Sequence, residues 1–240
     1  MKNRLDRLLV ERGLADSREK AQALIMAGEV LVNGQKALKA GQPVPEDARV
    51  EVLARPPFVS RGGIKLAAAL RHFSIEVAGK VCADIGSSTG GFTDALLQAG
   101  ALRVHAVDVG AGQLAWSLRT DARVRLHEGI NARTLTAVEI GEPVDLVTCD
   151  VSFISVTLVL PAMVPLLRPG GQMVILIKPQ FEVGKGQVGK GGIVRRPEQH
   201  QAACERVRQA VRDFGFHTDM IDSPIAGAEG NREFLLYAHH

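Results

Sequence analysis

The sequence predicts an α/β protein, with a doubly wound, mostly parallel sheet that follows a small α+β domain. Strand-like and helix-like segments alternate from residue 60 to the end of the chain. Several strand-like segments, such as VCADIG and MVILI, are apolar without alternation, as strands covered on both faces are. Before residue 54 the pattern changes to two short helices and a hairpin, followed by ARPPF, whose prolines predict a stiff linker. We therefore expect domains at 1–54 and 60–240, with a linker at 55–59.

The first 54 residues are expected to fold as helix, helix and hairpin. RLDRLLVERG places its leucines on one helical face, and REKAQALIMAG forms a second helix that Asp16 or Ser17 can cap. EVLVNGQKA is typical of a hairpin with a type I′ turn at Asn33-Gly34, and residues 49–53 add a short strand.

The larger region is expected to supply seven strands: VCADIG, RVHAVD, VRLHEG, DLVTCD, MVILIK, a stretch near 220–223, and EFLLYA. Helical patterns lie between them, including residues 93–99 and 198–214. The uncharged run 151–167 contains two prolines and is shorter than the ~20 residues that span a bilayer, so we expect a loop and helix inside the core. In such sheets, ligands bind beyond the carboxyl ends of the strands.

Composition narrows the class of protein. The chain has 240 residues, of which 46% are apolar and 23% charged, with a net charge of +3. Cys82, Cys149 and Cys204 show neither CxxC spacing nor a histidine cluster, so we expect buried reduced thiols and no metal site. The charged N-terminus has no signal-peptide pattern. We expect a cytoplasmic protein that does not enter membranes; its oligomeric state is not determined by the sequence.

A glycine-rich turn follows the first strand of the predicted sheet, in VCADIGSSTGGFTDALL. Gly86, Gly90 and Gly91 allow the backbone to approach a ligand at a helix N-terminus, although the spacing is not the GxGxxG of dinucleotide sites. Asp108 ends the second strand, where a carboxylate can accept hydrogen bonds from ribose hydroxyls. Asn131 follows the third strand, where an adenine edge can bind. The alternative is a tight connection without a ligand.

Asp84-x-Gly86 together with Asp108 resembles the cofactor site of class I S-adenosylmethionine-dependent methyltransferases. The resemblance implies a Rossmann-like class I methyltransferase sheet and S-adenosyl-L-methionine as the cofactor. The cofactor-binding residues expected on this basis are Asp84, Gly86, Ser87, Ser88, Thr89, Gly90, Gly91, Phe92, Asp108, Asn131 and Asp150.

The loop GKGQVGKGG fits the phosphate-binding pattern G-x-x-x-x-G-K up to Lys190. Gly191 stands where a serine or threonine would hold magnesium, and no helix follows directly. Nucleotide hydrolysis is therefore disfavoured, and docking of an RNA backbone on this basic loop is the better interpretation.

The fourth strand ends in Asp150, and Val151-Ser152 follow it. Amino-directed methyltransferases usually carry two prolines there, so N-methylation is disfavoured. Cys149 raises the alternative of a C5-pyrimidine nucleophile. Because residues alternate along a strand, however, Cys149 should face away from the site if Asp150 faces it.

Lys65, Asp150, Lys178 and Glu233 together resemble the Lys-Asp-Lys-Glu tetrad of RrmJ/FtsJ-type RNA 2′-O-methyltransferases. Taken alone, Lys178 could simply reach solvent from its strand end. A ribose 2′-hydroxyl must lose its proton as it attacks a methyl group, and desolvation and a nearby ammonium both favour the neutral form of a lysine that accepts it. In this hypothesis Lys178 is the base, Lys65 favours its neutral form, and the carboxylates hold the lysines and the hydroxyl in line. Glu233 rests on one short stretch, NREFLLYA.

Domain order and motifs resemble the TlyA family, often labelled hemolysin A, which joins an S4-type RNA-binding domain to an FtsJ-like methyltransferase. The motifs are RLDRLLVERGLADSREKAQALIMAGEVLVNG, SRGGIKL, DIGSSTGGFTD, AVDVGAGQLAW, CDVSFIS and KPQFEVGKGQVGKGGIVR. The resemblance implies 2′-O-methylation of cytidine in ribosomal RNA, with ribosomal RNA or ribosomal subunits as the partner. The linker ARPPF departs from the aromatic-containing tetrapeptide of some members, which bears on coupling between the domains.

Basic side chains are the candidates for RNA contact: Arg4, Arg7, Arg18, Lys20, Lys36, Arg61, Lys185 and Lys190. The first domain is almost free of aromatic residues, so we expect shape and phosphate contacts rather than base stacking. An ordinary solvated helix surface is the alternative. Two other functions stay open: a membrane-lytic protein, disfavoured because no strongly amphipathic cationic helix is present, and a non-catalytic RNA-binding protein that kept the fold.

Overall fold

The computed structural model describes residues 2–53, 56–184, 186, 188–189, 191–227 and 230–240. The chain divides into two compact units, Met1–Pro56 and Pro57–His240. Each unit has its own buried apolar core.

The smaller unit packs two helices against short strands. Its elements are β1 (Lys2–Arg4), α1 (Leu5–Glu11), α2 (Arg18–Met26), β2 (Val30–Val32), β3 (Gln35–Lys36), β4 (Pro43–Pro45) and β5 (Val50–Val52). Leu5 and Leu9 from α1 are fully buried against Ile25 from α2, as the helical spacing of the leucines predicts. Ser17 caps α2, because its hydroxyl accepts a hydrogen bond from the Lys20 N–H at 3.2 Å.

The hairpin of the smaller unit is confirmed at Asn33-Gly34. Both residues have positive φ, 50° and 79°, as a type I′ turn requires. Strand β2 lies between β3 and β5, and β1 pairs with β4 in a separate two-stranded sheet that the sequence pattern does not predict.

The larger unit contains a seven-stranded sheet in the order β11-β12-β10-β9-β6-β7-β8. The strands are β6 (Val81–Ile85), β7 (Arg103–Asp108), β8 (Val124–Glu128), β9 (Val144–Cys149), β10 (Leu167–Ile177), β11 (His217–Asp222) and β12 (Phe234–His239). Strand β12 runs antiparallel to β10 and β11, and the other pairs are parallel. The predicted α/β class and all seven predicted strands are confirmed.

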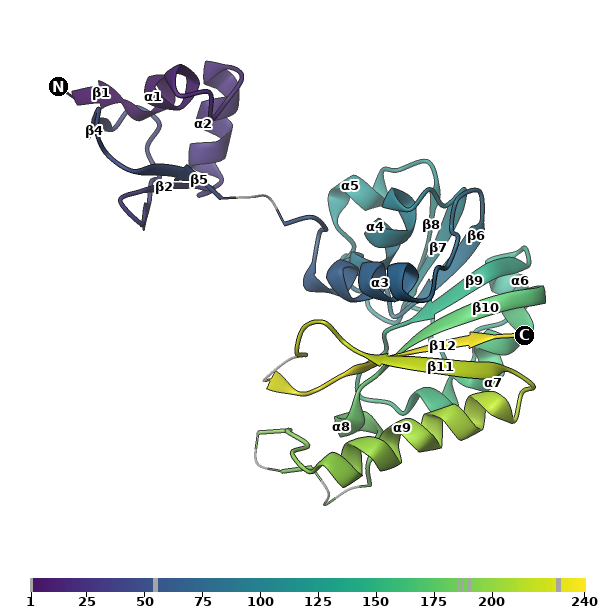
Figure 1. Ribbon diagram of the computed structural model, residues 1–240. Helices are drawn as coiled ribbons and strands as arrows, with labels where there is room; N and C mark the ends of the chain where they lie inside the picture. Colours follow the sequence, from purple (N-terminus) through teal and green to yellow (C-terminus); the bar gives the residue numbers. More distant parts are fainter. Residues whose placement is uncertain (1, 54–55, 185, 187, 190, 228–229) are drawn as a thin grey trace. The chain divides into compact units, whose positions relative to one another are not determined.

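Helices cover both faces of this sheet (Figure 1). One face carries α3 (Arg61–His72), α4 (Gly91–Gln98) and α5 (Trp116–Arg119), and the other carries α6 (Ala137–Ile140), α7 (Leu160–Met163), α8 (Pro179–Glu182) and α9 (Pro197–Arg212). The 3₁₀ turns η1 (Val156–Leu158) and η2 (Val164–Leu166) flank α7. Leu66 and Leu96 belong to the core of the first face, and Met163 and Val207 to that of the second.

The chain order creates a switch point at the centre of the sheet. From β6 the chain moves outward through β7 and β8, and it then returns to build β9 and β10 on the other side. The carboxyl ends of β6 and β9 therefore flank the crevice where doubly wound sheets bind ligands. The start of β12 lies at the same edge, because Phe234 pairs with Ile177 at the end of β10.

The state of the cysteines, the grouping of possible metal ligands and the length of the helices bear on metal binding and on membrane insertion. Cys82, Cys149 and Cys204 are buried free thiols, and burial raises the pKa of each to about 12. Within the described residues, no group of three or more His, Cys, Asp or Glu side chains could hold a metal ion. In the same part of the chain, no helix combines the length and the apolar character needed to cross a bilayer.

Candidate active site

The glycine-rich turn between β6 and α4 lies directly against the end of β9. Gly86 has φ +85°, and a Cβ at this position would lie 2.7 Å from the backbone oxygen of Asp150. At Gly90, φ is +97°, and a Cβ would lie 2.3 Å from the side chain of Leu118. A side chain at either position would push the turn off its neighbours, so glycine is needed for this close approach.

Asp84 lies beneath the turn and is fully buried. Its carboxylate accepts hydrogen bonds from the hydroxyls of Thr93, at 2.7 Å, and Thr148, at 3.1 Å. Burial raises the pKa of Asp84 to about 7. The structure therefore places Asp84 behind the glycine-rich turn, where it ties α4 to β9, rather than on the surface that a cofactor would touch. Gly90 is buried in the same way.

Two ion pairs bring the four predicted tetrad residues together at the carboxyl edge. Lys178 Nζ lies 2.6 Å from Asp150 Oδ1 and donates to Ser152 Oγ at 2.9 Å. Lys65 Nζ, from α3, contacts Glu233 Oε2 just before β12. The side chains of Lys65 and Glu233 are only 10% and 3% exposed, and that of Lys178 is 12% exposed. The two ion pairs are thus largely shielded from solvent.

Lys65, Asp150 and Lys178 line one cavity of about 300 Å³, which we name the lysine cavity. Ser152 lines it as well, and Glu233 lies behind Lys65. The remaining walls come from the start of α3 and from the glycine-rich turn: Ser60, Arg61, Gly62, Gly86, Ser87, Ser88, Thr89, Gly91 and Phe92.

A second cavity, of about 440 Å³, adjoins the first and is named the Asp108 cavity. Asp108, the last residue of β7, and Asn131, which follows β8, both line it. Both carboxylate oxygens of Asp108 accept backbone N–H groups, from Ser88 at 2.7 Å and Gly110 at 2.8 Å. Both cavities are lined by Gly86, Ser88, Asp150 and Ser152. The two cavities therefore meet at the ends of β6 and β9.

Some residues of the site have no counterpart among the sequence-based candidates. Ser152 contacts Lys178, and Gln113 and Phe153 line the Asp108 cavity. Phe153 is 92% exposed with φ +64°, and its ring centre lies 5.2 Å from that of Phe181. The sequence signal that could have pointed to Phe153 is the segment Val151-Ser152-Phe153. In amino-directed methyltransferases an aromatic residue follows two prolines at this place, and only the aromatic residue is matched here.

Cys149 does not take part in the site. It is fully buried and lines neither cavity, and burial raises the pKa of its thiol to about 12. The prediction from strand alternation, that Cys149 faces away from the surface of Asp150, agrees with this position.

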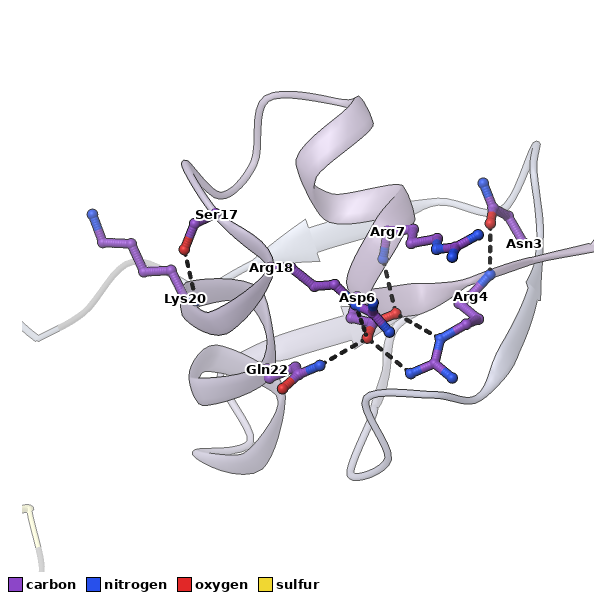
Figure 2. Close-up of polar contacts among 8 residues, drawn as sticks. All are labelled: Asn3, Arg4, Asp6, Arg7, Ser17, Arg18, Lys20 and Gln22. Carbon is purple, nitrogen blue, oxygen red and sulfur yellow. Dashed lines mark hydrogen bonds and ion pairs between the residues drawn. The ribbon is translucent and has the colours of Figure 1, made fainter.

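In the smaller unit, a buried carboxylate organises two of the predicted RNA-contacting arginines (Figure 2). Asp6 is fully buried and accepts two hydrogen bonds from Arg4, at 3.1 and 2.9 Å, one from Arg18 Nε at 2.9 Å and one from Gln22 at 3.0 Å. Hydrogen bonding to the Arg4 guanidinium holds the pKa of Asp6 well below its usual range. The arginine side chains are each 46% exposed, so each stays partly open to solvent while Asp6 holds it.

The other candidate RNA contacts lie apart from this network. Arg7, Lys20 and Lys36 are exposed in the smaller unit, where Lys20 Nζ pairs with Asp16 at 2.5 Å. Arg61 is exposed at the start of α3, beside the lysine cavity. Lys185 and Lys190 lie outside the described residues.

The residues around the cavities suit a nucleoside cofactor. The buried hydroxyl oxygen of Ser87, in the wall of the lysine cavity, has no partner among the described residues. In the adjoining cavity, Asp108 is positioned to accept from ribose hydroxyls while Ile130 and Phe153 offer apolar surface.

This combination of a doubly wound sheet, a glycine-rich turn and adjoining cavities at the switch point defines a methyltransferase of the class I type. The chain belongs to the FtsJ-like methyltransferase family, whose pattern matches residues 58–240, and an S4 domain matches residues 3–50. The cofactor of this enzyme is S-adenosylmethionine.

Relatives align with nearly the whole of this chain. The 16S/23S rRNA (cytidine-2′-O)-methyltransferase TlyA of Mycobacterium tuberculosis is 48% identical over 98% of this chain and 88% of its own length. YqxC of Bacillus subtilis is 48% identical over 99% of this chain and 86% of YqxC. A solved structure from Streptococcus thermophilus that carries the name hemolysin has a TM-score of 0.76 and 43% identity, and covers 99% of this chain and 88% of its own.

Proposed function

We propose that this protein transfers the methyl group of S-adenosylmethionine to the ribose 2′-hydroxyl of a cytidine in ribosomal RNA. The observation that carries the proposal is the pair of buried, ion-paired lysines, Lys65 and Lys178, at one cavity beside the nucleoside site. The relative from M. tuberculosis is named for the same reaction on cytidine.

In the proposed reaction, Lys178 accepts the proton of the 2′-hydroxyl as the hydroxyl oxygen forms its new bond to carbon. Asp150 and Ser152 fix the Lys178 amine in position, and Asp150 stabilises the ammonium that results. Lys65, from α3, lines the same cavity. Glu233 balances the buried charge of Lys65.

The cofactor would be held by the glycine-rich turn, Ser87 and Asp108. When bound, it would supply a methyl group on a positively charged sulfur, and that sulfur would keep the electrons of the broken carbon–sulfur bond and leave as a neutral thioether. Positioning of the hydroxyl and proton transfer are then the main contributions of the chain's own residues. The S4 domain would bind the RNA, with Arg4 and Arg18 held by Asp6 as phosphate contacts.

The test replaces Lys178 by alanine. Radiolabelled methyl transfer to intact ribosomal subunits and to naked rRNA should fall by about 10²- to 10⁴-fold, the usual contribution of a positioned general base. Binding of S-adenosylmethionine, measured by calorimetry, should stay within about threefold of wild type. Mass spectrometry of digested rRNA should detect 2′-O-methylcytidine with the wild-type protein only.

Each alternative has its own outcome. Full activity of the Lys178→Ala variant would remove Lys178 as the base. If the wild-type protein bound rRNA but transferred no label, the chain would be an RNA-binding protein that kept the fold. Lysis of liposomes without cofactor would instead support the membrane-lytic interpretation.

A further inference from the structure

A third cavity, of about 350 Å³, lies on the α9 side of the sheet and is named the Arg208 cavity. Its walls include His200, Cys204 and Arg208 from α9, Met220 from β11, and Arg232 and Phe234 at the start of β12. It shares no lining residue with the lysine cavity or the Asp108 cavity. Phe234 directly follows Glu233, and because side chains alternate along a strand, the two residues face opposite sides of the sheet.

Two buried polar atoms of this cavity's wall residues have no partner among the described residues: His200 Nδ1 and Arg208 Nε. His200 is only 5% exposed, and its Nε2 lies 2.9 Å from the carbonyl oxygen of Val194. Since a carbonyl only accepts, Nε2 carries the proton, and in the neutral ring Nδ1 is left as an acceptor. Arg208 Nε–H is a donor. Buried polar groups are almost always paired, and both residues line the cavity, so the unpaired donor and acceptor indicate a ligand toward which these side chains turn when it binds.

The charges around the cavity argue against a simple anion site. Each cation has an acidic neighbour: Arg208 lies 3.6 Å from Glu205, and Arg232 lies 3.1 Å from Asp222. The cavity therefore has no excess of positive charge for a phosphate. Its apolar surface is instead suited to a flat ring, because Phe234 and Met220 line it and the guanidinium of Arg232 lies 5.6 Å from the Phe234 ring centre.

We propose that the Arg208 cavity holds an unstacked nucleobase of the RNA substrate, one other than the base of the methylated nucleotide. The edge of a nucleobase presents a hydrogen-bond donor beside an acceptor, which His200 Nδ1 and Arg208 Nε–H complement once the two side chains turn toward the base. The base face packs against the apolar wall that includes Phe234. Recognition of splayed-out bases by stacking and edge hydrogen bonds is a general means of reading RNA sequence. The inference rests on the proposed function, since the base comes from the same RNA.

The binding test uses the full-length protein with ¹³C-labelled methionine methyl groups. AMP, CMP, GMP and UMP are titrated in turn, and ribose 5-phosphate serves as the probe without a base. We expect at least one nucleotide to shift the Met220 methyl resonance, and ribose 5-phosphate to leave it in place. Arg208→Lys keeps the charge but loses the Nε–H donor, so the shift should disappear. Arg212→Lys is the matched control, because Arg212 lies one turn further along α9, donates to Thr218 and does not line the cavity.

The second test measures methyl transfer to intact ribosomal subunits. Arg208→Lys should raise KM for the subunits by about 3- to 10-fold, the usual effect of one lost hydrogen bond, with kcat and cofactor affinity unchanged. Arg212→Lys should change KM by less than about twofold. His200 is left intact in these tests because it also holds Val194 in place.

Three results would overturn the inference. An equal Met220 shift with ribose 5-phosphate would make the cavity an anion site. A nucleotide-dependent shift with unchanged KM in Arg208→Lys would make it a site for free nucleotides rather than for the RNA. Absence of any shift together with an unchanged KM would leave the cavity without a ligand. Failure of the proposed function is seen separately, as absence of methyl transfer by the wild-type protein, because the nucleotide titration does not depend on the reaction.

Discussion

Asp84 shows how a single carboxylate can support the cofactor site without touching it. Its folded-state pKa of about 7 lies above the ordinary value of 3.8, so the folded protein binds this proton more tightly than the unfolded chain. The stabilisation is complete below pH 3.8 and is lost as the pH rises through about 7. The pKa difference corresponds to about 4 kcal/mol in the free energy of unfolding.

Replacing Asp84 by asparagine should remove this pH dependence. Between pH 4 and pH 8, we expect the free energy of unfolding of wild type to fall relative to that of Asp84→Asn by up to about 4 kcal/mol. Urea unfolding followed by circular dichroism at several pH values measures the gap between the two proteins. A gap that stays constant over this range would show that Asp84 does not titrate differently in the folded state.

The Lys65–Glu233 pair is a buried ion pair, and its stability effect should differ from that of a surface pair. Glu233→Gln leaves the Lys65 charge without a countercharge, and we expect a loss of about 3–5 kcal/mol in the free energy of unfolding. Combining Glu233→Gln with Lys65→Met removes that charge and should recover most of the loss. Denaturant unfolding of the two single variants and the double variant gives the coupling. A loss below about 1 kcal/mol for Glu233→Gln would place the pair in a solvent-like environment.

At the scale of elements, the contact between the β6–α4 turn and the end of β9 should control cofactor binding. A Cβ on Gly86 would meet the backbone of Asp150 at 2.7 Å, and rotation of a side chain cannot relieve that clash. Overpacking of this kind usually costs about 1–3 kcal/mol, so we expect Gly86→Ala to weaken S-adenosylmethionine binding by about tenfold or more.

Gly141 provides the matched control for Gly86. Its φ of +83° is close to the +85° of Gly86, but a Cβ there would have no atom within 4 Å. Gly141→Ala therefore carries a similar backbone strain without the clash, and its cofactor affinity, measured by calorimetry, should equal that of wild type. Equal losses of affinity in both variants would attribute the effect to backbone strain alone.

The elements also show what the sequence could and could not predict. Uninterrupted apolar runs mark the strands of the large sheet, because both faces of the sheet are covered by helices. Strand β10 begins earlier than the pattern MVILIK indicates, since the Pro169-Gly170-Gly171 segment hides its first half. The β1–β4 pair was missed for a related reason: β4 is Pro-Val-Pro, and β1 is polar throughout.

The same distinction applies to the site. The strand pattern alone places Asp150 and Lys178 at strand ends, where ligands bind in such sheets. Their grouping with Lys65 and Glu233 was predicted from the resemblance to the Lys-Asp-Lys-Glu tetrad. The partner of Lys65 could not be predicted in this way. Glu233 reaches it because β12 runs antiparallel and starts at the carboxyl edge, and no local pattern encodes that reversal.

At the scale of the whole molecule, the net charge of +3 is small, so RNA affinity should depend on where the charges lie. Arg18 is a suitable probe, because Asp6 holds its Nε while the side chain stays 46% exposed. If Arg18 contacts a phosphate, Arg18→Gln should reduce the slope of log affinity against log salt by about 0.7–0.9. The measurement is binding to rRNA between about 50 and 200 mM salt.

Arg168→Gln removes the same charge from the larger unit at a different place. Arg168 lies at the beginning of β10, at the opposite end of the strand from Lys178, and pairs with Asp145 at 3.1 Å. A surface charge in this position should have little effect on the salt slope, because counterions are released only where phosphates are contacted. A reduced slope for Arg18→Gln with an unchanged slope for Arg168→Gln would locate the RNA contact on the S4 domain. Equal changes in the two variants would mean that RNA responds to total charge rather than to the arginines that Asp6 positions.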